Sequence, residues 1–317
     1  MTCYSTVVYF RGRRFGTALC AGLLMALCVI SSSAPAHAAE PFEQAIWPGI
    51  APGSENSALV EKNDDREIKD GTGVPRDRSI SGITKPTITV YLPKEAKRPT
   101  AAVLLIPGGK MSRVVIDKEG HDIARWLVKQ GIAGIVLKYR NPDPDAGLSV
   151  SNGAAKDVAR AVRMVRHNAK KWNVAVDRIG TMGFSAGGYL VAWSAVRFDA
   201  GDAAASDPIE VQSSRPDFIA PIYGAVASPI QAKEGSPVLV RADTPPAFLV
   251  HAHDDKAVSS EQSITFYLAL RDAKVPAELH IYAQGGHGFG TRARGLPVSS
   301  WIERWLEWMI SQELHTP

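Results

Sequence analysis

A serine flanked by glycines is the clearest candidate for chemistry in this chain. The segment Gly183-Phe184-Ser185-Ala186-Gly187 has the G-x-S-x-G spacing that allows a serine to occupy a sharp turn between a strand and a helix. The glycines are needed because a larger side chain at either position would collide with the neighbouring backbone. Such a turn exposes the serine Oγ and points the positive end of the following helix at it. The segment therefore predicts that Ser185 is a nucleophile.

The partners that a serine nucleophile needs follow in the order acid, then histidine. Asp255 lies in the segment His251 to Val258, which directly follows the apolar run 247–250, and the adjacent Asp254 is an alternative acid. His287 lies in a glycine-rich segment after the last apolar run, so a tight loop can bring it close to Ser185. In this arrangement His287 takes and returns the serine proton, while Asp255 orients the imidazole and stabilises its charged form.

A second glycine-rich segment, Ile106-Pro107-Gly108-Gly109-Lys110, follows an apolar run upstream of the serine. Backbone N–H groups at such a turn can bind the oxyanion that forms when an acyl group is attacked. We expect the N–H groups of Gly109 and Lys110 to form this oxyanion hole together with that of Ala186.

The elements that must hold these residues alternate between strands and helices. Buried or alternating apolar runs predict strands, and amphipathic or apolar segments between them predict helices. Such alternation predicts one α/β domain with a mostly parallel sheet covered on both faces, whose strand ends carry the functional loops. The predicted strands are 87–92, 101–106, 132–137, 178–182, 218–222, 247–251 and 277–282. The predicted helices are 119–130, 157–172, 186–197, 260–273 and 300–312.

Two of the predicted helices carry side chains that could also bind ligands. Helix 157–172 presents a row of arginines opposite its apolar stripe, for which a solvated face is the favoured interpretation over a binding patch. The last helix carries three tryptophans that could stack on sugar rings, but apolar neighbours on the same helix favour closure of the core. These residues are Arg160, Arg163 and Arg166, and Trp301, Trp305 and Trp308.

Several of these segments together resemble the α/β-hydrolase superfamily. The resemblance rests on IPGG at 106–109, KYR at 138–140, DVARAVRMVR at 157–166, GFSAGGYL at 183–190, VHAHDD at 250–255 and GGHGFG at 285–290. More narrowly, the chain is similar to the acetyl esterase/lipase-like branch that includes acetylxylan esterase-type enzymes, some of whose secreted members carry xylanase labels. The opening IWPGIAPG at 46–53 adds to this likeness, which spans about Ile46 to Trp308.

The resemblance implies an α/β-hydrolase fold and a catalytic triad on Ser185, Asp255 and His287. Within the family pattern Asp-x-x-Val, Asp255 with Val258 is favoured over Asp254 as the acid. It also implies hydrolysis of short acyl esters of carbohydrates, such as acetylated xylan, with no cofactor and no metal. Only about two dozen residues separate the strands 218–222 and 247–251, so we expect a short lid or none over the site.

Three other functions share parts of this pattern. His251-x-His253-x-Asp255 resembles the start of a zinc-hydrolase motif, but Lys256 stands where a further histidine belongs. A serine exopeptidase of the prolyl-oligopeptidase type shares the serine turn and the Asp-Asp loop, although the polar segment before residue 86 is too short for the propeller domain that normally accompanies it. A non-catalytic binding protein on the same fold would usually have lost a triad member, and this chain keeps all three in order.

The first 38 residues are typical of a cleavable export signal. Three arginines precede the apolar run Phe15 to Ile30, and Ala36-His37-Ala38 fits the small-x-small cleavage pattern. The apolar run is shorter than a membrane-spanning helix requires. We therefore expect cleavage after Ala38, a secreted or periplasmic protein, and no stable membrane anchor after cleavage. The expected organisation is a signal peptide at 1–38, a polar and irregular segment at 39–85 that packs on the domain, and a catalytic domain at 86–317.

Removal of the signal changes the composition that bears on function. The whole chain has 36 Lys+Arg against 32 Asp+Glu and three cysteines. All three cysteines and three of the arginines precede residue 39, so the remainder is cysteine-free and nearly neutral. This excludes a disulfide framework, a thiol nucleophile and a cysteine metal site in the mature chain. The small charge gives no indication of nucleic-acid binding, and the expected partner is a small-molecule, oligosaccharide or polysaccharide ester.

Overall fold

The computed structural model describes residues 40–67, 76–94, 96–231 and 239–316. These described residues belong to one compact unit. The predicted signal peptide and its cleavage site lie outside the described residues. Among the helices in the described part, none is long and apolar enough to cross a membrane.

The central sheet has eight strands in the order β1-β4-β7-β5-β8-β9-β10-β11. From β7 to β11 all neighbours are parallel, and β1 and β4 form an antiparallel edge. The predicted mostly parallel sheet is therefore confirmed. Its strands are β1 Phe42–Ala45, β4 Thr87–Tyr91, β5 Thr100–Ile106, β7 Ala133–Lys138, β8 Val174–Phe184, β9 Ile219–Ile222, β10 Ala247–Ala252 and β11 Ala277–Tyr282.

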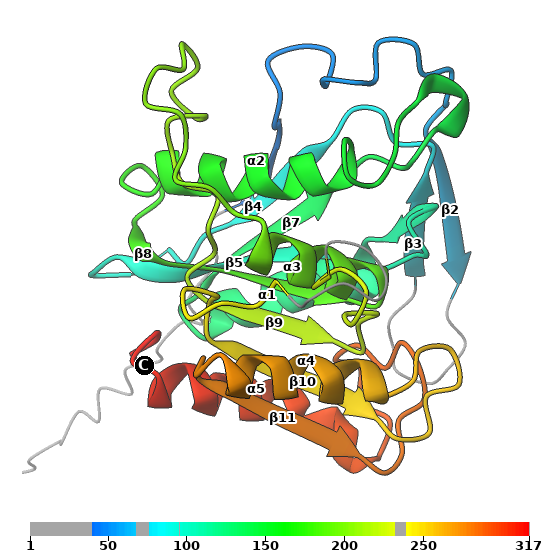
Figure 1. The fold of residues 1–317 in the computed structure, drawn as a ribbon, viewed down its shortest axis with the longest axis vertical. Coiled ribbons are helices and arrows are strands. Elements are labelled where there is room, and N and C mark those ends of the chain that lie inside the picture. Colours follow the sequence, from blue (N-terminus) through cyan, green and yellow to red (C-terminus); the bar gives the residue numbers. More distant parts are fainter. Residues whose placement is uncertain (1–39, 68–75, 95, 232–238, 317) are drawn as a thin grey trace, which may run out of the picture. The chain divides into compact units, whose positions relative to one another are not determined.

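Helices cover both faces of this sheet (Figure 1). α2 and α3 pack on one face, while α1 and α5 pack on the other, and α4 lies beside β10 and β11. The bounds are α1 Asp122–Lys129, α2 Ala154–His167, α3 Ala186–Val196, α4 Glu261–Asp272 and α5 Trp301–Ser311. A π-helical turn η1, Asp117–His121, precedes α1, and short 3-10 turns occur at Pro144–Ala146 (η2) and Pro297–Ser300 (η3).

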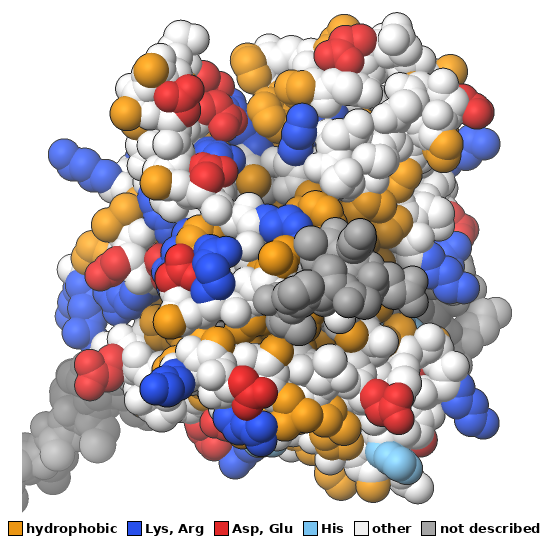
Figure 2. All heavy atoms as spheres, viewed as in Figure 1, with side chains coloured by type: hydrophobic (Ala, Val, Ile, Leu, Met, Phe, Trp, Pro, Cys, Tyr) orange, Lys and Arg blue, Asp and Glu red, His pale blue; other side chains and the backbone are white. Residues whose placement is uncertain are grey.

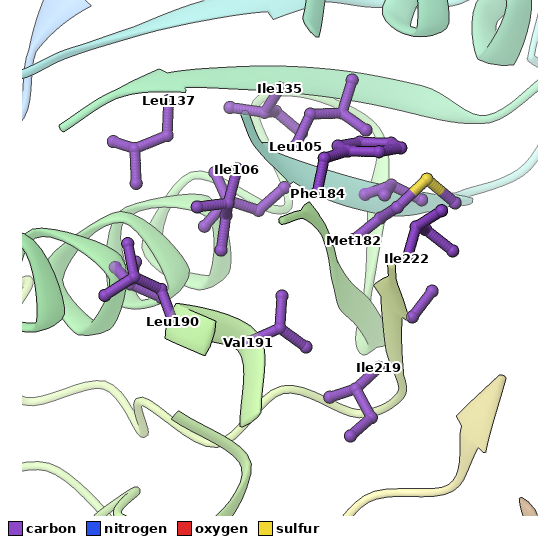
Figure 3. Packing of buried hydrophobic residues seen from close by; sticks show 14 of the residues in the cluster. Leu105, Ile106, Ile135, Leu137, Met182, Phe184, Leu190, Val191, Ile219 and Ile222 are labelled. Carbon is purple, nitrogen blue, oxygen red and sulfur yellow. The ribbon is translucent and has the colours of Figure 1, made fainter. Parts of the chain in front are cut away.

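The sheet and its helices enclose one large hydrophobic core. Buried side chains of β5, β7, β8 and β9 lie close together, with Leu190 and Val191 of α3 packed towards them (Figure 3). On the opposite face, the ring of Phe184 in β8 meets Trp301 of α5 edge-on at 6.2 Å. Trp301, Trp305 and Trp308 are all buried, so their predicted role in closing the core is confirmed.

The segment before residue 86 differs from the prediction of an irregular chain. It forms β1, which pairs with β4 at the sheet edge, and two strands of a separate antiparallel sheet in the order β2-β3-β6. These strands are β2 Lys62–Glu67, β3 Arg76–Ser81 and β6 Arg113–Val115. The polar composition of β2 and β3 hid them, because buried positions of β3 are filled by Asp77 and Ser79 as well as Ile80 and so show no apolar alternation.

The arginines of α2 contradict the interpretation of a solvated helix face. Arg160 and Arg163 are only 2% and 9% exposed. Arg160 pairs with Asp207 and Glu210, each at 2.7 Å, and Arg163 pairs with Asp199 at 2.5 Å. The loop between α3 and β9 supplies these acids and covers the helix face. In Figure 2, which views the molecule from the α2 and α3 side, basic and acidic side chains lie next to one another at many places.

Helix α2 also begins and ends earlier than predicted. It starts at Ala154 rather than Asp157 and ends at His167 rather than Trp172. Residues 168–173 instead form turns that lead into β8, and Asn173 takes a positive φ of 53°. The apolar periodicity continued through these turns because Ala169 and Trp172 are buried in the same core.

Candidate active site

Ser185 occupies the turn between β8 and α3 in a strained backbone conformation. Its φ of 53° and ψ of −113° lie outside the regions that non-glycine residues normally adopt. The flanking glycines permit this turn. A Cβ on Gly183 would lie 2.3 Å from the carbonyl oxygen of Gly187, and a Cβ on Gly187 would lie 1.8 Å from that of Ile106. The packing therefore explains the G-x-S-x-G spacing, and the strain is located at the predicted nucleophile.

His287 and Asp255 lie in line with Ser185. The Nε2 of His287 is 2.8 Å from the Oγ of Ser185, and the Nδ1 of His287 is 2.7 Å from the Oδ2 of Asp255. The three residues come from the ends of β8, β10 and β11, which the parallel sheet brings to one edge. The structure thus brings together the three side chains that the sequence analysis selected.

Asp255 is fixed as an ionised acceptor by its surroundings. Burial alone would raise its pKa, but hydrogen bonds from Val258 N–H, from His287 and from Ala257 N–H outweigh burial and hold the pKa below its usual value. The two N–H groups donate to Oδ1 at 2.9 and 2.8 Å, and Oδ2 lies 2.7 Å from Nδ1 of His287 and 3.4 Å from Nε2 of His251. This is the protonation state that can orient an imidazole and stabilise its charged form.

Asp254, the alternative acid, has a different place in the structure. Its Oδ1 accepts hydrogen bonds from the N–H groups of Gly285 at 2.9 Å and Gly286 at 2.7 Å. On the same loop, Arg294 donates to the carbonyl oxygens of Gly285 and Gly288, both at 3.2 Å. Asp254 therefore anchors the loop that carries the histidine, and Asp255 contacts the histidine itself.

A second histidine next to the site, His251, is held in the neutral form. Its Nε2 contacts the carbonyl oxygen of Val258 at 2.9 Å, so the proton belongs on that nitrogen, and its Nδ1 contacts the Ser263 hydroxyl at 2.8 Å. Burial lowers the pKa of His251. Its neighbour His253 is exposed to solvent. Within the described residues, no group of three or more His, Cys, Asp or Glu side chains is arranged to hold a metal ion.

The glycine-rich loop after β5 lies directly against the serine. A Cβ on Gly108 would lie 3.0 Å from the Cβ of Ser185. Gly109 and Lys110 have positive φ values of 138° and 57°, which turn the loop sharply. In the described part of the chain, the N–H groups of Gly109 and Lys110 donate to no other protein group, whereas the N–H of Gly108 donates to Glu119 at 2.8 Å. The N–H of Ala186, in the first turn of α3, has no partner within the helix.

The serine and histidine remain accessible from solvent. Ser185 is half-buried, and the His287 side chain is 27% exposed. Between β9 and β10, where the sequence predicts a short lid or none, the described residues form no helix; residues 232–238 of that segment are outside the described part.

Two residues near the site escaped the sequence analysis. Glu119 is buried beneath the glycine-rich loop, and the ring of Tyr223 meets that of His287 edge-on at 5.2 Å. Glu119 stands in a predicted helix and Tyr223 just after a predicted strand, and neither position belongs to a spacing pattern with a chemical meaning. The one available signal is topological, because Tyr223 follows the carboxyl end of β9, where parallel sheets place functional residues.

Comparison with known proteins agrees with this geometry. The BD-FAE family model matches residues 88–217, which include Ser185 and the glycine-rich loop. An acetylxylan esterase of Xylanibacter ruminicola is 34% identical over 67% of this chain and 45% of its own length. An endo-1,4-beta-xylanase B of Butyrivibrio fibrisolvens is 29% identical over 59% of this chain and 32% of its own length. The chain thus spans less than half the length of these two curated relatives.

A solved structure matches over a larger share of the fold. The acetyl ester-xyloside bifunctional hydrolase of Caldicellulosiruptor lactoaceticus superposes with a TM-score of 0.65 at 29% identity, covering 82% of this chain and all of the other. The sheet order, the strained serine turn and these relatives lead to the same family. The chain has the α/β-hydrolase fold and is similar to esterases of that superfamily.

Proposed function

We propose that this protein is a serine carboxylic-ester hydrolase in which Ser185, His287 and Asp255 form the catalytic triad. The continuous contact from Asp255 through His287 to the strained Ser185, at 2.7 and 2.8 Å, carries the proposal. Those distances are within the reach that proton transfer between a nucleophile and its base requires.

Acylation follows from the positions of these atoms. The Ser185 Oγ attacks the ester carbonyl carbon while its proton passes to Nε2 of His287. Asp255 accepts the hydrogen bond from Nδ1–H and stabilises the imidazolium that forms. The tetrahedral intermediate then collapses, the bond to the alcohol oxygen breaks, and the Nε2 proton is delivered to that oxygen. The alcohol leaves, and the acyl group remains on Ser185.

Deacylation repeats these steps with water. The neutral His287 takes a proton from a water molecule, whose oxygen attacks the acyl carbon, and returns that proton to the Ser185 Oγ as the carboxylic acid departs. In both steps the negative charge on the carbonyl oxygen is stabilised by backbone N–H groups, for which we assign Gly109, Lys110 and Ala186. Lys110 contributes through its amide, so its side chain places no limit on this role.

The proposed substrates are short acyl esters of carbohydrates, with acetylated xylan as the main candidate. Support comes from the names of the relatives, an acetylxylan esterase, a xylanase and an acetyl ester-xyloside hydrolase. The accessible serine agrees with a bulky alcohol such as a polysaccharide. We further propose export to the periplasm or exterior with cleavage after Ala38, which would bring the enzyme to such a polymer, and a catalytic domain at 86–317 with residues 39–85 packed on it.

Substrate profiling tests this proposal. Acetate release from acetylated xylo-oligosaccharides is compared with hydrolysis of p-nitrophenyl acetate, longer-chain aryl esters and dipeptide amides. We expect the acetyl esters to be hydrolysed and the amides to be left intact. Hydrolysis of the dipeptide amides in preference to esters would contradict the assignment, and so would activity that survives Ser185→Ala and disappears with a chelator. Ser213→Ala, which removes a half-buried hydroxyl that donates to the carbonyl oxygen of Asp199, is the control variant.

A further inference from the structure

Glu119 is a buried carboxyl group that the triad mechanism does not use. It belongs to η1 and is 4% exposed. Its Oε2 accepts the hydrogen bond from Gly108 N–H at 2.8 Å, and its Oε1 accepts one from the Tyr223 hydroxyl at 2.9 Å. Both oxygens are therefore used to hold other parts of the protein, one on the glycine-rich loop and one behind the histidine.

The Gly108 contact decides how the glycine-rich loop presents its amides. By accepting from Gly108 N–H, Glu119 removes that donor from the site and fixes the peptide next to Ser185. The next amide, that of Gly109, is then the one left for substrate, at the residue with the positive φ of 138°. An oxyanion hole depends on such fixed orientation, because misplaced donors lose most of their value in the transition state.

The Tyr223 contact reaches the histidine side of the site. The Tyr223 hydroxyl also accepts a hydrogen bond from Gly290 N–H at 3.3 Å, three residues after His287. Its ring packs edge-on against His287 at 5.2 Å and against Phe289 at 4.4 Å. Tyr223 itself adopts a positive φ of 40°, which is a strained backbone conformation for a residue other than glycine. Glu119 therefore connects the loop after β5 with the loops after β9 and β11.

Burial disfavours the ionised form of the Glu119 carboxyl group. Burial raises the pKa of Glu119, while Lys118, the Gly108 N–H and the Tyr223 O–H act in the opposite direction. A buried polar network of this kind is tolerated when every member is satisfied, and it then fixes a single arrangement of its partners.

We propose that Glu119, acting through Gly108 and Tyr223, is a positioning residue that fixes the oxyanion loop and His287 at defined positions relative to Ser185. The inference rests on the proposed esterase function and deepens it. Glu119 touches neither substrate nor the reacting atoms. It acts by holding the two halves of the site, the oxyanion donors and the general base, at one mutual distance.

Two conservative substitutions test the link. Glu119→Gln keeps the size but turns one acceptor into a donor, and Tyr223→Phe keeps the ring against His287 but removes the hydroxyl. We expect each to lower kcat for p-nitrophenyl acetate about tenfold or more, with KM changed by less than about twofold. The double variant should lose little more than either single one, because both break the same connection.

The control is Tyr91→Phe. It also deletes a buried tyrosine hydroxyl, whose partner at 2.9 Å is Nδ1 of His121 rather than Glu119. Its kcat should equal that of the wild type. Binding of a phenylboronic acid, whose tetrahedral adduct places an oxygen in the oxyanion hole, should weaken in both test variants and stay unchanged in the control. Test variants with the kinetics and boronate affinity of Tyr91→Phe would overturn the inference.

A readout without turnover separates this inference from the proposed function. Hydrogen–deuterium exchange of the peptide around Gly108 should be faster in Glu119→Gln than in the wild type, because glutamine keeps one acceptor oxygen for the two donors, Gly108 N–H and the Tyr223 hydroxyl. Faster exchange in a protein without esterase activity would support the connection and refute the proposed function. Unchanged exchange together with unchanged kcat in an active enzyme would refute the connection alone.

Discussion

Two pairs in this molecule, Arg140–Asp157 and His287–Asp255, each join a buried aspartate to a nitrogen-bearing side chain and differ in what they leave unpaired. Arg140 and Asp157 are completely buried and contact each other at 2.8 Å. Asp157 also accepts from the Trp47 indole N–H, and Arg140 donates to the carbonyl oxygen of Pro52. Each group of that pair is therefore satisfied by protein, and the pair ties the N-terminal segment to β7 and α2.

The His287–Asp255 pair has an open end. Both carboxylate oxygens of Asp255 accept hydrogen bonds from protein groups. In contrast, Nε2 of His287 faces Ser185 at a half-exposed position. The N–H groups of Gly109 and Lys110 in the glycine-rich loop also have no hydrogen-bond acceptor among the described residues. Burial and charge alone therefore do not mark a functional site. The mark is an ordered polar chain that ends at a group which solvent or substrate can reach.

The largest expected effect comes from changing Asp255, the acid of the His287–Asp255 pair. Asp255→Asn should lower kcat by about 10⁴-fold, because an amide cannot hold the imidazole in the tautomer that accepts the serine proton. The unfolding midpoint should change little. Steady-state kinetics with p-nitrophenyl acetate and thermal unfolding give the two numbers.

Asp254→Asn is the matched control for this prediction. Asp254 binds the amides of Gly285 and Gly286 rather than the imidazole. Its substitution should cost less than about tenfold in kcat. Equal losses in the two variants would show that the acid of the triad is misassigned.

A substitution in the fully buried Arg140–Asp157 pair should lower stability and leave activity unchanged. Arg140→Met leaves the Asp157 carboxylate buried without its cation, so we expect a loss of about 3–5 kcal/mol in the free energy of unfolding. The midpoint should fall by about 10 °C. The activity of the protein that remains folded should be unchanged, as measured by kcat per active site.

The double variant Arg140→Met/Asp157→Leu serves as its control, since removing both charges removes the unpaired one. It should be more stable than Arg140→Met alone. A double variant that is less stable than the single one would indicate that the pair itself contributes more than its desolvation costs.

A smaller effect is expected at the edge of the arginine cluster. Arg163→Ala breaks a contact to Asp199, whose side chain is 57% exposed, so the loss should be about 1 kcal/mol. Lys156→Ala, at an exposed position of the same helix, should change stability by less than about 0.5 kcal/mol. Chemical denaturation of both variants checks the difference. Equal values would restore the interpretation of a solvated helix face.

The smallest effect concerns pH. The folded-state pKa of Asp255 lies below that of an unfolded aspartate, about 3.9, so in acid the unfolded chain binds this proton more readily than the folded one. The stabilisation is present above that pH and is lost as the pH falls through the lower folded-state value. The difference in unfolding free energy between the wild type and Asp255→Asn should therefore be larger at pH 7 than at pH 3. Urea denaturation at pH 7 and at pH 3 measures this difference. A difference that is the same at the two pH values would contradict the prediction.

The sequence was sufficient for the elements and side chains whose spacing has a physical meaning. The serine turn needs Gly183 and Gly187 because backbone atoms would collide with any larger side chain. The strands β5, β7 and β10 are buried on both faces and appear as continuous apolar runs. The roles of Ser185, Asp255 and His287 remain a proposal, but their proximity follows from the order of strand ends in a parallel sheet.

The remaining features depend on partners far along the chain. Arg160 and Arg163 looked solvated because the acids that cover them come from residues 199–210, in a loop without a recognisable pattern. Glu119 and Tyr223 are 104 residues apart and meet only through the fold. Contacts of this kind become visible once the tertiary structure is known.

Stoichiometric labelling by a fluorophosphonate tests the central claim most directly, because the reagent reacts with a serine activated by an adjacent base. The wild-type protein is titrated with the reagent, residual hydrolysis of p-nitrophenyl acetate is followed, and the modified peptide is identified by mass spectrometry. We predict one adduct per chain, located on Ser185, with activity lost in the same proportion, and no adduct in His287→Ala. An adduct on another residue, or full activity in a fully labelled protein, would contradict the account.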